Sequence, residues 1–261
     1  MKKLSVCRFS TMAAVASAFT LTYATSAANI GFVVGVGNGT IDQTFDIGWA
    51  ARLTSLGHTV TTIVETNAAS TPLLGTMDLF IVSSDVASGS VLSGIGINQP
   101  KPYITYEYGI WDEIFGGTSP NTTAGAANNI TILNSLSPLA AGLSGNVSMY
   151  TGTGGGPRVN LSPVAAGTQV IASSVSNSTY AVMLNLEPGQ LGGLVSSVQY
   201  GPWSSRRIGV PCYADWDPAL VTADGWKILD GAVAYALIPE PSSVALIGLG
   251  LAALLLRRRA R

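Results

Sequence analysis

Residues 29–36 have the sequence NIGFVVGV, a short apolar run in which only the first residue is polar. A run of this length and composition is typical of a strand that is buried on both faces of a parallel sheet. Apolar residues at helical spacing follow, namely Phe45, Trp49, Leu53 and Leu56. Gly57 comes directly after them, at the place where the end of a helix favours a residue that tolerates positive φ. A second strand is predicted over 58–65, so this unit is a right-handed crossover with parallel strands.

Two further buried-type strands are predicted over 77–83 (MDLFIVS) and 102–106 (PYITY), separated by a Gly/Ser-rich stretch with weak helical character. Together with the crossover they predict an α/β fold with a flavodoxin-like, doubly wound and mainly parallel sheet. The second half is richer in Asn, Thr, Ser and Gly, and its closely spaced β-type runs favour added antiparallel hairpins. These runs are 129–133, 146–151, 168–173, 180–186 and 207–213. A last helix is predicted after Thr222, with Pro239 ending it.

Both ends of the 261-residue chain differ from its middle. Residues 1–28 begin with basic residues, continue with an apolar stretch and finish with Ser26-Ala27-Ala28, which predicts a signal peptide that forms a helix before removal. A structural N-terminal helix is the alternative. The remaining segments are then one globular domain over 29–238 and a separate tail over 239–261, since about 210 residues are enough for one core.

Charge and cysteine content exclude several classes of function. The 29–238 segment holds six basic and thirteen acidic residues, a net charge of −7, which argues against a nucleic-acid partner. Cys7 falls in the predicted signal peptide, so the mature chain has no internal disulfide. The single histidine and the scattered acids predict no metal centre, and no cofactor is expected.

The tail combines a proline-containing motif, an apolar stretch over 244–256 and a cluster of arginines, and no packed domain would bury all three together. The apolar stretch predicts a short C-terminal apolar helix, which falls below the roughly 20 residues of a relaxed transmembrane helix. The motif comprises Pro239, Glu240, Pro241 and Ser242, and the arginines are Arg257, Arg258, Arg259 and Arg261. An ordinary C-terminal membrane anchor, with the arginines on the cytoplasmic side, is the alternative interpretation.

This tail resembles the PEP-CTERM sorting signal of Gram-negative bacteria. The resemblance implies an inner-membrane intermediate, with the arginine cluster as the stop of the tail. It also implies processing at the motif by an exosortase-type enzyme and delivery to the cell surface or the exopolysaccharide matrix. It covers only the last 23 residues, and it describes a destination rather than an activity.

The middle of the chain resembles the class I glutamine amidotransferase-like fold, including its ThuA-like branch. The resemblance rests on the order of elements and on short stretches: 56–60 (LGHTV), 77–82 (MDLFIV), 101–104 (KPYI), 137–145 (SPLAAGLSG) and 205–209 (SRRIG). In catalytic amidotransferases a cysteine occupies a sharp turn after a strand and works with a later histidine. The corresponding turn, 106–109 (YEYG), contains neither cysteine nor serine, so amidotransferase chemistry is expected to be absent and no catalytic residue is assigned.

A cysteine–histidine pair and a dinucleotide-binding glycine motif are the two other functional motifs to consider, and both are incomplete. Cys212 is predicted to be a buried apolar filler rather than a nucleophile, and His58 to be a surface turn residue at the sheet edge opposite any site. The glycines at 35, 37 and 39 follow the first strand, but Thr40 stands where a dinucleotide-binding motif has its third glycine.

Carboxylates near the predicted carboxyl ends of strands leave one further option. Aromatic residues beside them would present flat apolar faces to a sugar, and the candidate ligand patch is Asp85, Tyr106, Glu107, Tyr108 and Trp111. Helix caps, loop charges and core packing explain the same residues equally well. We therefore expect an exported, non-catalytic domain with polysaccharide as the candidate ligand, and the alternative is a carboxylate-dependent hydrolase acting on matrix polysaccharide.

Overall fold

The computed structural model describes residues 27–35, 41, 43–65, 72–93, 98–116, 123–124, 128–160 and 164–239. The predicted signal peptide, apart from its last two residues, and the tail beyond Pro239 lie outside these ranges. The helices expected at the two ends are therefore not among the described elements. Within the described ranges, no helix is both long and apolar enough to cross a membrane.

The first half of the chain alternates strands and helices, as expected. Its elements are β1 (Asn29–Val34), α1 (Thr44–Ser55), β2 (Thr59–Val64), the 3-10 helix η2 (Pro72–Thr76), β3 (Leu79–Val82), α2 (Ser88–Ser93), β4 (Tyr103–Thr105), the 3-10 helix η3 (Tyr108–Ile110) and α3 (Trp111–Phe115). The weakly predicted helix between the third and fourth strands is the short α2.

The second half consists mainly of strands and ends in one long helix. Its elements are β5 (Thr123–Ala124), β6 (Asn129–Ile132), η4 (Pro138–Ala140), β7 (Gly145–Ser148), β8 (Gly155–Gly156), β9 (Val159–Asn160), β10 (Gln169–Ser174), β11 (Tyr180–Leu186), β12 (Leu194–Val195), β13 (Val198–Gln199), β14 (Arg207–Gly209), η5 (Pro218–Leu220) and α4 (Ala223–Ala236).

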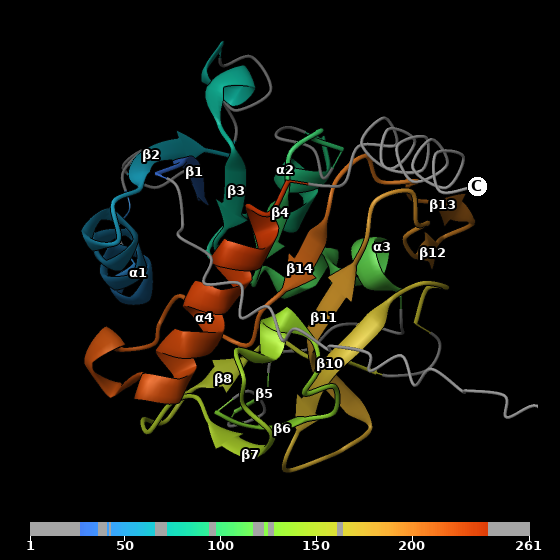
Figure 1. Ribbon diagram of the computed structural model, residues 1–261. Coiled ribbons are helices and arrows are strands. Elements are labelled where there is room, and N and C mark those ends of the chain that lie inside the picture. Colours follow the sequence, from blue (N-terminus) through green and yellow to red (C-terminus); the bar gives the residue numbers. More distant parts are fainter. Residues whose placement is uncertain are drawn as a thin grey trace, which may run out of the picture.

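One large sheet runs through the described domain in the order β2-β1-β3-β4-β14-β11-β10-β6-β7 (Figure 1). All neighbours from β2 to β14 are parallel, and all neighbours from β14 to β7 are antiparallel. The α/β class is confirmed, but the sheet is mixed rather than flavodoxin-like and mainly parallel. Among the described strands, parallel pairing is limited to the five from β2 to β14, because the remaining strands join the sheet as antiparallel neighbours.

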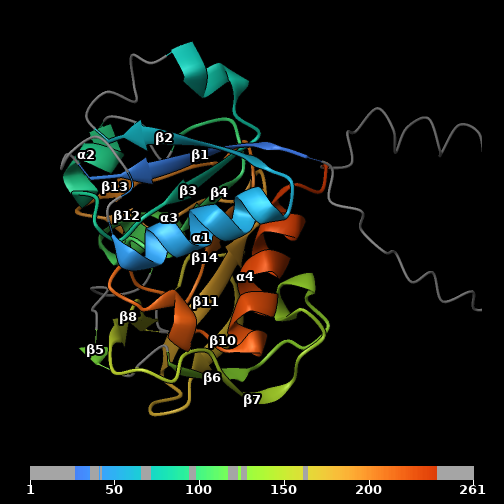
Figure 2. The same ribbon diagram turned by 90° about the vertical axis from the view of Figure 1, so that its left-hand side faces the viewer.

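The sheet separates two hydrophobic cores. Along β1, the side chains of Phe32 and Val34 point into one core and that of Val33 into the other, as the alternation of a strand requires. Helices α1 and α4 cover the first core and lie side by side across one face of the sheet (Figure 2). Stacking of Phe45 on Trp226, with ring centroids 6.1 Å apart, joins these two helices. Helices α2 and α3 contribute to the second core.

Local sequence signals fix the ends of the two long helices. Gly57 follows α1 with φ of +92°, and because open space surrounds its Cα, the backbone conformation is what favours glycine there. The Thr222 side chain caps α4 by accepting a 2.9 Å hydrogen bond from the Gly225 amide, as expected.

Two sequence-based expectations are wrong. Strand β14 belongs to the 207–213 run that was assigned to hairpins, yet it lies parallel to β4 inside the sheet. His58 is buried rather than exposed, with only 4% of its surface accessible, and the charge of Asp230 acts on it, so the turn before β2 lies near α4.

Candidate functional site at the carboxyl edge of the parallel strands

Three carboxylates follow three strands of the parallel set, β2, β3 and β4, of which β3 and β4 are direct neighbours and β2 is separated from β3 by β1. Glu65 comes directly after β2, Asp85 lies in the turn after β3, and Glu107 lies after β4. Parallel strands end at one edge of a sheet, and ligands of such folds bind there. The Glu65 carboxylate accepts a 2.6 Å hydrogen bond from the Ala87 amide, and Asp85 accepts one of 3.2 Å from the Gly35 amide. The polypeptide thus brings these charges together across three loops.

Glu107 is the most perturbed of these three carboxyls. Only 4% of its surface is exposed, and it caps η3, where Oε1 accepts a 2.8 Å hydrogen bond from the Gly109 amide. Burial raises its pKa to about 8. The Gly109 hydrogen bond opposes this rise, whereas the charges of Asp85 and Glu65 add to it. Glu107 therefore holds a proton at neutral pH, as a general acid would.

Asp46, from the first turn of α1, forms a second polar group beneath this edge. It is fully buried, and its two carboxylate oxygens accept hydrogen bonds from the Ser83 hydroxyl at 2.6 Å and from the Tyr106 hydroxyl at 2.5 Å. These contacts tie α1 to β3 and β4 and satisfy a charge that would otherwise be costly to bury. Burial, then the Asp46 charge, raises the pKa of Tyr106 well above its usual range.

The fully buried Cys212 belongs to the first hydrophobic core. Burial raises the pKa of its thiol well above the usual range, and the charge of Asp46 raises it further. His58 precedes β2 at the opposite end of the parallel strands. Burial lowers its pKa, against the opposing effect of Asp230. These environments favour the structural role that the sequence suggested for Cys212.

The structure divides the candidate ligand patch. The rings of Tyr106 and Trp111 are fully buried and belong to different hydrophobic cores on the two sides of the sheet, so neither ring can stack on a ligand in this conformation. Asp85 and Tyr108 are partly exposed and stay at the edge with Glu107. The part of the patch that we retain as a proposal is therefore Asp85, Glu107 and Tyr108.

Sequence reasoning missed Tyr213 at this site. Tyr213 is partly exposed, and burial raises its pKa, with further contributions from Tyr108, Asp215 and Glu107, so its hydroxyl lies near these groups. Tyr213 follows β14, the fifth strand of the parallel set. The sequence analysis included Tyr213 in the β-type run 207–213 and favoured hairpins for that run, so Tyr213 was not considered for the carboxyl edge of the parallel strands.

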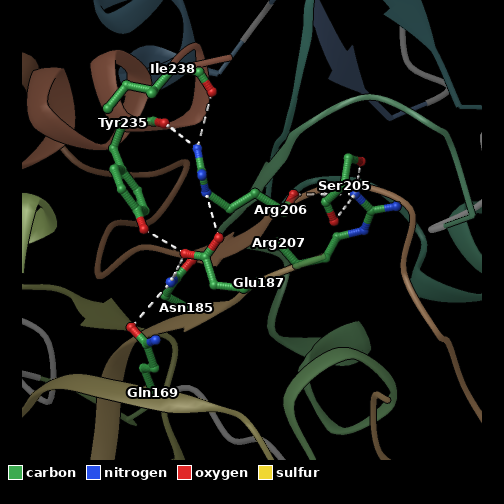
Figure 3. A network of polar contacts seen from close by, with 8 residues as sticks. All are labelled: Gln169, Asn185, Glu187, Ser205, Arg206, Arg207, Tyr235 and Ile238. Atoms are coloured by element: carbon green, nitrogen blue, oxygen red, sulfur yellow. Dashed lines mark hydrogen bonds and ion pairs between the residues drawn. The ribbon is translucent and has the colours of Figure 1, made fainter. Parts of the chain in front are cut away.

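A different polar network lies at the amino end of the parallel strands, where α4 ends (Figure 3). Arg206 precedes β14, and its Nε donates to Glu187 Oε2 at 3.1 Å. Its Nη1 donates to the carbonyl oxygens of Tyr235 at 2.6 Å and Ile238 at 3.4 Å. Glu187 also accepts hydrogen bonds from Tyr235 and Asn185. Burial alone would raise the pKa of Glu187, but these hydrogen bonds and the charge of Arg206 lower it overall.

No group of three or more His, Cys, Asp or Glu side chains in the described ranges is arranged to hold a metal ion.

Comparisons with known proteins bear on the tail and on the fold. Residues 237–259 match the PEP-CTERM protein-sorting motif, which confirms the motif predicted from the sequence. The domain is similar in structure to a ThuA-like protein from Bacteroides uniformis, with a TM-score of 0.43 and 8% sequence identity. The similarity covers 80% of this chain and 91% of that protein. No curated protein sequence matches the chain.

Proposed function

We propose that the chain is an exported domain that an exosortase-type enzyme processes at Pro239–Ser242 and that then reaches the cell surface or the exopolysaccharide matrix. The match of residues 237–259 to the PEP-CTERM sorting motif carries this proposal. The domain itself binds polysaccharide without catalysis, through the carboxyl edge of its parallel strands. An inner-membrane intermediate precedes release.

The position of Ile238, directly before the motif, supports this arrangement. Arg206 stands at the amino end of β14 and contacts the chain at Ile238, one residue before the motif. Glu107 follows β4, at the other end of the same parallel strands. A chain held by its tail therefore has the candidate ligand edge pointing away from the attachment point, where a large polymer has access to it.

The edge offers groups that suit a polymer rich in hydroxyls. Glu107, protonated at neutral pH, both donates and accepts hydrogen bonds, and the Asp85 carboxylate accepts them. Tyr108 and Tyr213 add two partly exposed aromatic rings, and tyrosine combines an apolar face with a polar tip. These four residues are the ligand patch that we propose.

One observation favours a second function, a carboxylate-dependent hydrolase. A protonated Glu107 beside the charged Asp85 has the two protonation states that glycoside hydrolysis requires of its carboxyl pair. The acid would protonate the leaving oxygen, and the carboxylate would act as base or nucleophile.

Processing is tested in the native host by cell fractionation and mass spectrometry of the C-terminal peptide. We expect a surface-borne chain that ends within 239–242, and a full-length membrane-bound chain when Pro239, Glu240 and Pro241 are replaced by alanine. Asp224→Asn, an exposed change within α4, is the control and should leave processing unchanged. A wild-type chain that keeps Arg261 in the inner membrane would refute the sorting proposal.

Binding and hydrolysis are separated with purified protein and exopolysaccharide from the same host. We expect the wild type to co-sediment with the polymer and Tyr213→Ala to lose most of this binding. Leu136→Ala, at a side chain that is 94% exposed on a turn of the antiparallel half, is the matched control. Release of reducing ends by the wild type but not by Glu107→Gln would instead establish the hydrolase. Failure of the wild type to co-sediment would refute polysaccharide binding.

A further inference from the structure

The last turn of α4 ends directly in front of the sorting motif, and Arg206 holds that turn. Its Nη1 bonds the carbonyl oxygens of Tyr235 and Ile238, and Pro239 is the next residue. The carbonyl groups in the last turn of a helix have no partners within the helix. The Tyr235 carbonyl accepts one hydrogen bond from the Ile238 amide, at 3.2 Å, besides the bond from Arg206. A cation that bonds them fixes the point where the helix stops.

Arg206 is itself held in place by burial and by two contacts of its guanidinium group. Its side chain is only 7% exposed, its guanidinium lies 4.2 Å from the Tyr235 ring centroid, and its Nε bonds Glu187. Glu187 is oriented in turn by the amide nitrogen of Asn185, at 2.7 Å. Figure 3 shows this chain of contacts from β11 through Glu187 and Arg206 to the end of α4. The clamp therefore joins the sheet, through Asn185 and Glu187, to the last turn of α4, where the Tyr235 ring and hydroxyl also contact it.

From this geometry we propose that Arg206 is a positioning residue for C-terminal processing: it fixes the folded domain up to Ile238, so that the processing enzyme receives a motif that starts at a set point. This inference rests on the proposed function, because it assigns a substrate-side role in the same cleavage. Loss of the clamp frees residues on both sides of Ile238. Each freed backbone residue costs about 1 kcal/mol or more to order again, which corresponds to a factor of about five in rate.

Arg52 provides a matched control. It also bonds a carboxylate, Asp230, at 2.5 Å and also lies over an aromatic ring of α4, that of Trp226, at 4.8 Å. The contacts of Arg52 with Asp230 and Trp226 lie about two turns or more before the end of the helix, away from the carbonyls that Arg206 holds. Arg52→Met therefore removes a comparable ion pair from α4 without releasing the residues in front of the motif.

The first measurement tests the clamp without the host enzyme. Full-length chain is treated briefly with proteinase K, and the mass of the resistant core gives its C-terminal residue. We expect the wild-type and Arg52→Met cores to end close to Pro239, and the Arg206→Met core to end about three residues earlier because the last turn frays. Arg206→Lys keeps the charge but has a single donor nitrogen, so it serves as the milder variant if Arg206→Met does not fold. Cores with the same end in all variants would overturn the clamp.

The second measurement is the half-time of processing in the native host, followed by pulse-chase. We expect Arg206→Met or Arg206→Lys to slow processing at least about fivefold relative to Arg52→Met, the factor that corresponds to one freed residue. A Gly-Ser-Gly-Ser insertion after Ile238 should abolish the difference, because the motif is then uncoupled from the domain. Equal half-times for the Arg206 and Arg52 variants would overturn the positioning role even if the core boundary moves. Absence of processing in the wild type would refute the sorting proposal, and the protease boundary would still decide whether the clamp exists.

Discussion

Replacing Glu107 by glutamine tests the electrostatics of the carboxyl edge. The pKa of this carboxyl rises from 4.5 to about 8 on folding, chiefly because the side chain is buried. The folded state therefore binds the proton more tightly than the unfolded state. The stabilisation that this difference provides is complete below about pH 4.5, and it is lost as the pH rises toward 8.

The size of the effect follows from the pKa shift. At 1.36 kcal/mol per pKa unit, the rise corresponds to a ceiling of about 5 kcal/mol between pH 4 and pH 9. The charges of Asp85 and Glu65 contribute to the raised pKa, so part of the effect depends on these two neighbours, and we expect about 2–4 kcal/mol for Glu107 itself. Glutamine has nearly the same shape and can still accept the hydrogen bond from the Gly109 amide. Its charge does not change with pH.

The assay is urea denaturation followed by tryptophan fluorescence at pH 5, 7 and 9. Glu107→Gln should match the wild type at pH 5 and exceed its free energy of unfolding by about 2–4 kcal/mol at pH 9. Asp224→Asn, which changes a partly exposed side chain, is the control. Its free energy of unfolding should differ from that of the wild type by the same amount at all three pH values. A difference in the free energy of unfolding between Glu107→Gln and the wild type that stays constant from pH 5 to pH 9 would refute the assignment of a raised pKa to Glu107.

Two further predictions concern the core and the last helix. Because burial raises the pKa of the Cys212 thiol, a disulfide exchange reagent at pH 8 should label it only after unfolding in guanidinium, and rapid labelling of the native chain would contradict its burial. Thr222→Ala removes the cap of α4 and should lower the free energy of unfolding by about 1 kcal/mol, measured by urea denaturation. Thr222→Ser, which keeps the hydroxyl, should stay close to the wild type.

Local pattern was enough to place most elements of the parallel half. Strand β1 points Phe32 and Val33 into two different cores, and such double burial leaves a continuous apolar run that is readable in the sequence. The end of α1 was equally readable, because positive φ at Gly57 is a local requirement. The hairpin pairs β6–β7 and β10–β11 also lie where short spacing predicts them.

Pairing between distant segments was not readable in this way. Strand β14 is separated from β4 by about a hundred residues, and nothing in its own sequence says that Ile208 pairs with Ile104. The same limit explains the divided ligand patch. Tyr106 and Trp111 are close in sequence and both aromatic, but the strand and the helix carry their rings into opposite cores. Their closeness in sequence suggested one patch, but their side chains lie on opposite faces of the sheet.

The insertion of β14 beside β4 links the two ends of the molecule. Because β14 runs parallel to β4, its amino end brings Arg206 to the last turn of α4, and its carboxyl end leads to Tyr213 beside Glu107. One short strand thus contributes to the clamp in front of the sorting motif and to the proposed ligand patch. In an antiparallel hairpin, as the sequence suggested, Arg206 and Tyr213 would exchange ends of the sheet. The parallel pairing of β14 is therefore the feature on which both proposals depend.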